Sequence, residues 1–120
     1  MSESSPKKIV KIYQDPRGKE PFIEWLESIQ DITTRARIKN RVRRIELGNL
    51  GDCKSVGKGV FELRLHFGAG YRAYCGQAGH IVVILLCGGD KRTQTQDIAL
   101  AQHYWADYKE SEEYEKDKEI

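Results

Sequence analysis

The sequence predicts a single α+β domain in which an N-terminal strand and a helical hairpin pack on an antiparallel sheet with a C-terminal helix. Two spacings predict this class. Apolar residues recur every three or four positions in three segments, which indicates amphipathic helices. Between the second and third of these segments they alternate with polar residues, which indicates strands. The length of 120 residues is typical of one domain. We therefore expect the order β-α-α-β-β-β-α.

The first half is expected to contain one strand and two helices. Residues 8–13 are rich in β-branched and aromatic side chains, and a turn cluster follows at 15–18. The first helix has one apolar stripe, made by Phe22, Trp25, Leu26 and Ile29. The second helix continues this spacing and meets a stop signal at Gly48. Its stripe is made by Ile38, Val42 and Ile45.

A strand meander is expected in the second half. Apolar and polar side chains alternate over 60–67. Glycine-containing turns at 68–70 and 76–79 flank a second strand at 71–75. Residues 81–87 form a continuous apolar run, which is typical of a central strand covered on both faces.

A last helix and an acidic tail are expected after the strands. Thr93 and Gln96 have the spacing of a capping box. The apolar stripe that follows is made by Ile98, Ala101, Trp105 and Tyr108. We expect residues 1–109 to form the domain and residues 110–120 to form a charged tail that extends this helix or frays.

Charge is segregated along the chain, although the net charge is only +2. Residues 32–51 hold six basic residues and one acidic residue, whereas residues 107–120 hold seven acidic and three basic residues. A basic body attracts phosphate backbones, but a charged run is also typical of a solvated helix face. The sequence has no apolar segment of the kind that a secretion signal or a membrane span needs, so we expect a cytoplasmic protein without a membrane partner.

The metal-binding residue types are scattered. They are Cys53, Cys75, Cys87, His66, His80 and His103. None of their spacings matches a zinc site or a redox pair, so we interpret the cysteines as reduced thiols and predict neither a metal nor a cofactor.

Candidate functional residues lie on two neighbouring strands. Successive side chains of a strand point to opposite faces of the sheet. If Leu63 and the residues in register with it point into the core, Arg64, His66, Arg72 and Tyr74 therefore lie together on the opposite face. Lys91 follows the central strand and is expected at the rim of that surface. Convergent cations suit an oxyanion or a phosphate. An arginine on an exposed strand can equally prevent aggregation or pair with a nearby glutamate.

Several linked motifs then resemble one toxin family. They are Gly51–Lys54, Val56–Val60, Phe61–Arg64, Gly70–Tyr74, Leu85–Lys91, Thr93, Gln94, Asp97 and Ile98. In this order and spacing they resemble the HigB-like branch of the RelE/ParE superfamily, the phage-derived killer proteins of addiction modules. The resemblance covers about residues 8–109 and implies a RelE-like fold of two helices, an antiparallel sheet and a C-terminal helix.

The resemblance also implies a function. RelE-type and HigB-type toxins of type II toxin–antitoxin systems cut messenger RNA on the ribosome, without a metal, by attack of the RNA 2′-hydroxyl on the adjacent phosphate. The implied partners are a helix-turn-helix antitoxin, the ribosome and mRNA, with operator DNA bound only through the antitoxin. Two alternatives remain open: a ParE-like inhibitor of DNA gyrase, and an inactive toxin that is retained as the partner of its antitoxin.

The family's site residues carry over by position. The resemblance implies that Arg64, Arg72 and Lys91 are catalytic. Nuclease members often have a tyrosine or histidine near the C-terminal end for proton transfer or stacking. Neither type occurs in the six residues after Lys91, and His103 and Tyr104 come later on the last helix, so we assign the general base to His66 with Lys91 as competitor. The expected RNA contacts are Lys54, Lys58, Tyr74, Arg41 and Arg44.

Overall fold

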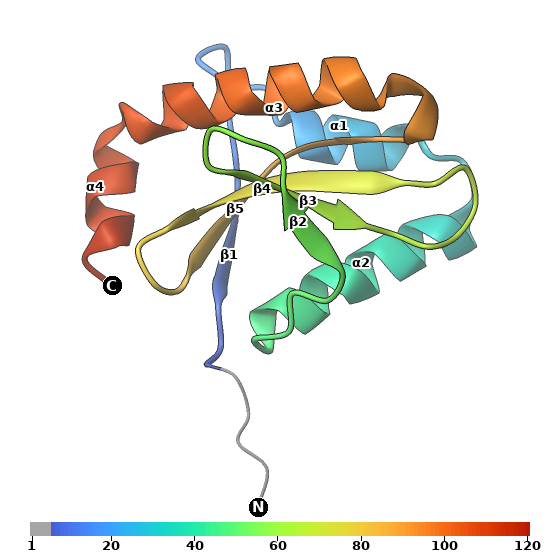
Figure 1. Cartoon of the computed structure of the whole chain (residues 1–120), viewed down its shortest axis with the longest axis horizontal. Helices are drawn as coiled ribbons and strands as arrows, with labels where there is room; N and C mark the ends of the chain where they lie inside the picture. Colours follow the sequence, from blue (N-terminus) through green and yellow to red (C-terminus); the bar gives the residue numbers. More distant parts are fainter. Residues whose placement is uncertain (1–5) are drawn as a thin grey trace, which may run out of the picture.

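A five-stranded sheet runs through the middle of the molecule, with helices on both of its faces (Figure 1). The computed structural model describes residues 6–120, so residues 1–5 of the expected domain lie outside the described residues. The elements are β1 (Ile9–Ile12), α1 (Pro21–Ser28), α2 (Ile32–Glu46), β2 (Cys53–Ser55), β3 (Val60–Arg64), β4 (Arg72–Ala78), β5 (Val82–Gly89), a 3-10 turn (Lys91–Thr93), α3 (Gln94–Lys109) and α4 (Glu112–Lys118). The predicted α+β class and the order of its principal elements are confirmed.

The strands lie in the order β1-β5-β4-β3-β2. The meander from β3 to β5 is antiparallel, as expected, and β2 pairs antiparallel with β3. β1 instead runs parallel to β5, with Ile9 opposite Val82, so the sheet is mixed. β2 is an addition to the predicted order, because an edge strand of three residues leaves no alternation to detect.

Two apolar cores lie on the two faces of the sheet. The core under α1 and α2 includes Phe22, Ile38 and Leu85, and the core under α3 includes Trp105 and Leu86. Successive β5 side chains alternate between these cores, and none from Val82 to Leu86 is more than 1% exposed. The prediction of a central strand covered on both faces is therefore confirmed.

The end of β5 is tightly enclosed. A Cβ atom on Gly88 would overlap the Trp25 ring of α1, and one on Gly89 would overlap the carboxylate of Asp97 in α3. Only glycine therefore lets α1 and the first turn of α3 approach this strand end from opposite faces. Lys91 follows directly and lies beside the turn that joins β3 to β4, because its backbone N–H donates to the Ala69 carbonyl at 3.4 Å.

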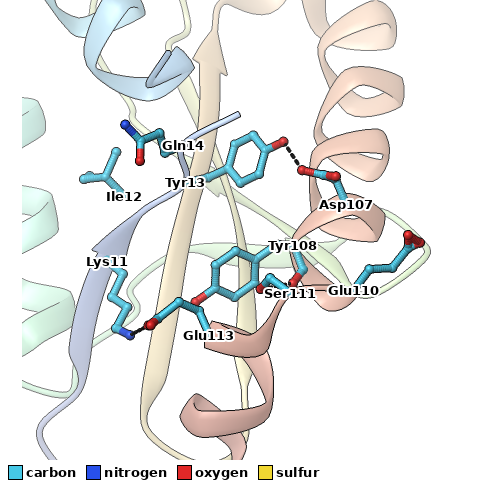
Figure 2. A pocket seen from close by; sticks show the side chains of 9 residues that line it. All are labelled: Lys11, Ile12, Tyr13, Gln14, Asp107, Tyr108, Glu110, Ser111 and Glu113. Carbon is cyan, nitrogen blue, oxygen red and sulfur yellow. Dashed lines mark hydrogen bonds and ion pairs between the residues drawn. The ribbon is translucent and has the colours of Figure 1, made fainter. Parts of the chain in front are cut away.

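The acidic tail is folded, contrary to the expectation that it would fray or extend α3. Ser111 caps α4, and Asp117, a residue of that helix, is fully buried. The Lys11 Nζ of β1 donates to Glu113 Oε2 and Asp117 Oδ1, both at 2.7 Å, and the Tyr108 hydroxyl also donates to Asp117. Figure 2 shows Lys11 reaching Glu113 across the hollow between β1 and the helices. We call the contacts of Asp117 with Lys11 and Tyr108 the tail clamp.

α4, which carries Asp117, follows the C-terminal end of α3 (Figure 1), and Lys91 precedes the N-terminal end of α3, so the tail clamp and Lys91 lie at opposite ends of this helix. A helix of 16 residues separates them by about 24 Å, so the acidic tail does not cover the surface around Lys91. Within residues 6–120 every helix is too short or too polar to span a bilayer.

Candidate phosphate-binding site

Arg64 and Arg72 lie directly opposite each other at the open end of the β3–β4 ladder. Their neighbours Leu63 and Ala73 point into the core under α1 and α2. Because successive side chains of a strand alternate between the two faces, both arginines point to the other face. The exposed fraction of the Arg64 side chain is 37% and that of Arg72 is 15%. The structure therefore brings the two guanidinium groups together at the edge of the protein.

A buried glutamate lies between the two arginines. Glu62 is 0% exposed, and its carboxylate is 3.6 Å from both the Arg64 Nε and the Arg72 Nε. Its Oε2 accepts hydrogen bonds from the Tyr74 hydroxyl at 3.1 Å and from the Gln94 Nε2 at 2.8 Å. Glu62 and Arg64 are two residues apart in β3, so their side chains lie on one face of the sheet.

The side chain of Lys91 approaches Arg72 at Gly70. Arg72 Nη1 donates to the Gly70 carbonyl at 2.9 Å. A Cβ on Gly70 would lie 3.2 Å from the Cβ of Lys91 and 3.6 Å from Arg72 Nη1, so both side chains border this glycine. Gly70 has a φ of +74°, which other residues rarely adopt. A larger residue at position 70 would therefore be strained and would crowd the Lys91 side chain.

Arg64 lines two adjoining hollows in the protein surface, and Arg72 lines the first of them. The first has a volume of about 430 Å³ and is bounded by the 64–68 segment, Gly70, Tyr71 and Arg72. The second has a volume of about 360 Å³ and lies between the same strand end and α2. Its α2 wall is a stripe at helical spacing made by Arg37, Asn40, Arg41 and Arg44. Segment 64–67 is common to both hollows.

His66 follows the end of β3 and borders the same hollow as Arg64 and Arg72. β3 ends at Arg64, and the exposed imidazole turns toward Asp52, with 2.5 Å between His66 Nε2 and Asp52 Oδ2. This hydrogen bond lowers the pKa of the Asp52 carboxyl below its usual value. Since Nε2 is occupied, Nδ1 is the nitrogen left to accept a proton from a bound molecule. His66 borders both hollows, so it is positioned for such a transfer.

Two of the expected RNA contacts are occupied within the protein. Arg41 is buried, and its guanidinium donates to the carbonyls of Leu50, Asp52 and Arg64 at 2.5–3.3 Å, which fixes the segment between α2 and β2. Tyr74 is 0% exposed beneath α3 and offers no ring face to a base. The interpretation of this strand face as an open polar surface was therefore wrong, because α3 covers its inner part.

The other expected RNA contacts are exposed. Arg44 lies on the wall of the second hollow. Lys54 is the cross-strand partner of Glu62 on β2, and Lys58 lies in the turn before β3. Arg37 was not among the expected contacts, and its guanidinium carbon is 5.2 Å from the centre of the Phe67 ring. Phe67 in turn packs against Tyr71, so an aromatic pair borders the first hollow.

The cysteines take no part in this site. Cys75 and Cys87 are buried, and burial raises the pKa of each thiol to about 12, so both remain protonated at neutral pH. In the part of the chain that the structure describes, three or more side chains suited to metal ligation do not come together. The site is thus a cationic hollow with one buried carboxylate and one histidine–aspartate pair.

Comparison with known proteins gives one informative similarity. No family model matches the chain. An uncharacterized protein of Haemophilus influenzae is 47% identical over 81 residues, which are 68% of this chain and 82% of that protein. Identity at this level over most of both chains reflects a shared fold and descent. The chain therefore belongs to the same family as this Haemophilus influenzae protein.

Proposed function

We propose that this protein is the toxin of a type II toxin–antitoxin system and that it cuts messenger RNA on the ribosome. The observation that carries the proposal is the pairing of Arg64 with Arg72 at the rim of a hollow, with Lys91 beside Arg72. Arginine presents several N–H donors in a planar fork, which matches the oxygens of a phosphate. The motifs that resemble HigB-like toxins include all three of these residues.

In the proposed reaction the RNA 2′-oxygen attacks the neighbouring phosphorus. A new 2′-oxygen–phosphorus bond forms while the bond from phosphorus to the 5′-oxygen breaks, which leaves a 2′,3′-cyclic phosphate and a 5′-hydroxyl. Negative charge grows on the two non-bridging oxygens during this step. Arg64 and Arg72 stabilise that charge, because donors held in place by the fold need no reorganisation. The nucleophile belongs to the substrate, so the mechanism uses no metal and no cofactor.

Two protons must move in this reaction. His66 is the proposed base: its Nδ1 accepts the proton of the 2′-hydroxyl, and Asp52 stabilises the resulting imidazolium. The 5′-oxygen must receive a proton as it leaves. The proposed donor is Lys91, whose side chain borders Gly70 as Arg72 does. Lys91 is also the competing candidate for the base.

The proposed partners follow from the resemblance and the charge. The basic α2 wall of the second hollow, with Arg37 and Arg44, suits the phosphates of mRNA or of the ribosome. A helix-turn-helix antitoxin neutralises the toxin in the cytoplasm, and operator DNA is contacted only through that antitoxin.

Primer extension on translated messages, after induction of the protein, tests the proposal. We expect new 5′ ends with the wild-type protein. Arg72→Ala should lower the cleavage rate by about 100- to 1,000-fold, because one transition-state donor is lost. Arg43→Ala is the matched control, because Arg43 is exposed on α2 outside both hollows.

Growth arrest without new RNA ends, or full cleavage by Arg72→Ala, would overturn the nuclease proposal. A supercoiling assay then identifies gyrase inhibition directly. Absence of growth arrest on expression points instead to an inactive toxin.

A further inference from the structure

We infer that Glu62 is a positioning residue that holds Arg64 and Arg72 side by side for a phosphate. The inference rests on the proposed function, because it assigns a role to a residue behind the same site. Glu62 does not reach the hollow itself: it is 0% exposed, and the residues that line the hollow exclude it. It acts on the substrate only through the two arginines.

The need for such a residue follows from the strand register. Arg64 and Arg72 are direct cross-strand partners, and like charges in that position repel each other. Glu62 precedes Arg64 by two residues on the same face, so its carboxylate lies between the two guanidinium groups. One carboxylate against two guanidinium groups leaves a net charge of +1 for an incoming anion.

The carboxylate is itself held in position from behind. The Tyr74 hydroxyl and the Gln94 side chain both donate to Oε2, so the β4 strand and the start of α3 fix where it points. Tyr74 is buried, and the nearby carboxylate adds to burial in raising the pKa of its hydroxyl above the usual value. Tyr74 therefore stays a neutral hydrogen-bond donor to Glu62.

The contacts on the arginine side are incomplete, which is what a ligand-dependent site requires. Glu62 Oε1, Arg64 Nε and Arg72 Nε are all shielded from water, and none has a hydrogen-bond partner among residues 6–120. Each Nε is 3.6 Å from the nearest carboxylate oxygen, just beyond a hydrogen bond. A phosphate bound by the outer N–H groups would orient both guanidinium groups. Their Nε–H groups would then point toward the Glu62 carboxylate.

Glu62→Gln separates positioning from simple charge. The substitution keeps the shape of the side chain but raises the net charge of residues 62, 64 and 72 together from +1 to +2. Charge alone would therefore strengthen RNA binding. Loss of positioning should instead lower kcat by on the order of a hundredfold without raising KM, because misplacement of catalytic groups acts on the transition state. Glu27→Gln, at an exposed position on α1, is the control.

The second readout does not depend on RNA cleavage. In nitrogen–proton NMR spectra, the Nε–H signals of Arg64 and Arg72 should both shift in Glu62→Gln and stay unchanged in Glu27→Gln. Titration with inorganic phosphate should move both signals of the wild-type protein with one midpoint. If Glu62→Gln does not fold, Tyr74→Phe replaces it, because it removes a hydrogen bond to Glu62 and keeps the charge; the same signals should shift.

These outcomes decide the role of Glu62 separately from the activity. Unmoved Nε–H signals in the folded variant, or an unchanged kcat, overturn the inference. A wild-type protein that cuts no RNA overturns the proposed function alone, and the NMR result still decides whether Glu62 holds the arginines.

Discussion

Two fully buried carboxylates lie at opposite ends of α3, and they differ in how completely they are paired. In the tail clamp, Asp117 accepts hydrogen bonds from Lys11 and Tyr108. Glu62 also accepts from a tyrosine, but its two cationic neighbours remain 3.6 Å away, and their Nε–H groups have no hydrogen-bond partner among residues 6–120. A buried charge that is fully paired mainly serves stability, whereas incompletely paired cations keep hydrogen-bonding capacity for a ligand. We therefore propose a structural role for Asp117 and a ligand-binding role for the arginines around Glu62.

The largest expected effect concerns Arg64. Arg64→Ala should lower the rate of mRNA cleavage by about 100- to 1,000-fold, because a donor to the developing phosphate charge is removed. The free energy of unfolding should change by less than about 1 kcal/mol, since the Arg64 side chain is more than a third exposed and makes no hydrogen bond to Glu62 within the described chain. Single-turnover cleavage and urea denaturation measure the two quantities. A large loss of stability with normal cleavage would reverse the assignment.

The opposite pattern is expected for Asp117. Asp117→Ala leaves Lys11 and Tyr108 without their shared acceptor and should lower the free energy of unfolding by about 2 kcal/mol, below the usual loss for a fully buried pair because Lys11 can still reach water. Cleavage at a temperature where the variant is folded should match that of the wild type. Glu119→Ala, at an exposed position on the same tail, controls for the loss of one acidic residue. A cleavage defect in folded Asp117→Ala would show that the two ends of α3 are coupled.

A smaller effect is expected from pH. Hydrogen bonds to Asp117 and Glu113 raise the pKa of Lys11 above its usual 10.5. A group with a raised pKa in the folded state contributes stability below its unfolded pKa and loses that contribution as the pH rises through the folded value. The wild-type melting temperature should therefore fall more steeply above pH 10.5 than that of Lys11→Met. Equal slopes in a thermal melting series would mean that this ion pair contributes no stability.

Much of the site could be predicted from local sequence because its geometry is local. The alternation around Leu63 and the turn before Arg72 are enough to pair Arg64 with Arg72 on one face. The buried run of β5 and the position of Lys91 after it follow in the same way. These features need only the period of a strand and the length of a turn.

Features that depend on packing could not be predicted. The start of α3 covers the inner part of the β3–β4 face, and this turns Glu62 and Tyr74 from surface residues into buried ones. The carbonyls that bind Arg41 come from residues nine or more positions away, so nothing near it in the sequence marks it as structural. α4 is polar apart from one tyrosine, and its docking depends on a lysine in β1.

The tail clamp also bears on the order of folding. Lys11 and Asp117 are 106 residues apart, so their contact closes nearly the whole chain into a loop. The entropy lost in closing a loop grows with its length, and the contact adds few apolar neighbours of its own to offset that loss. Neighbouring strands of the β2–β5 meander are joined by short turns, so their pairing loses less loop-closure entropy. Docking of α4 is accordingly a late step, taken on a sheet in which Arg64 and Arg72 already face each other.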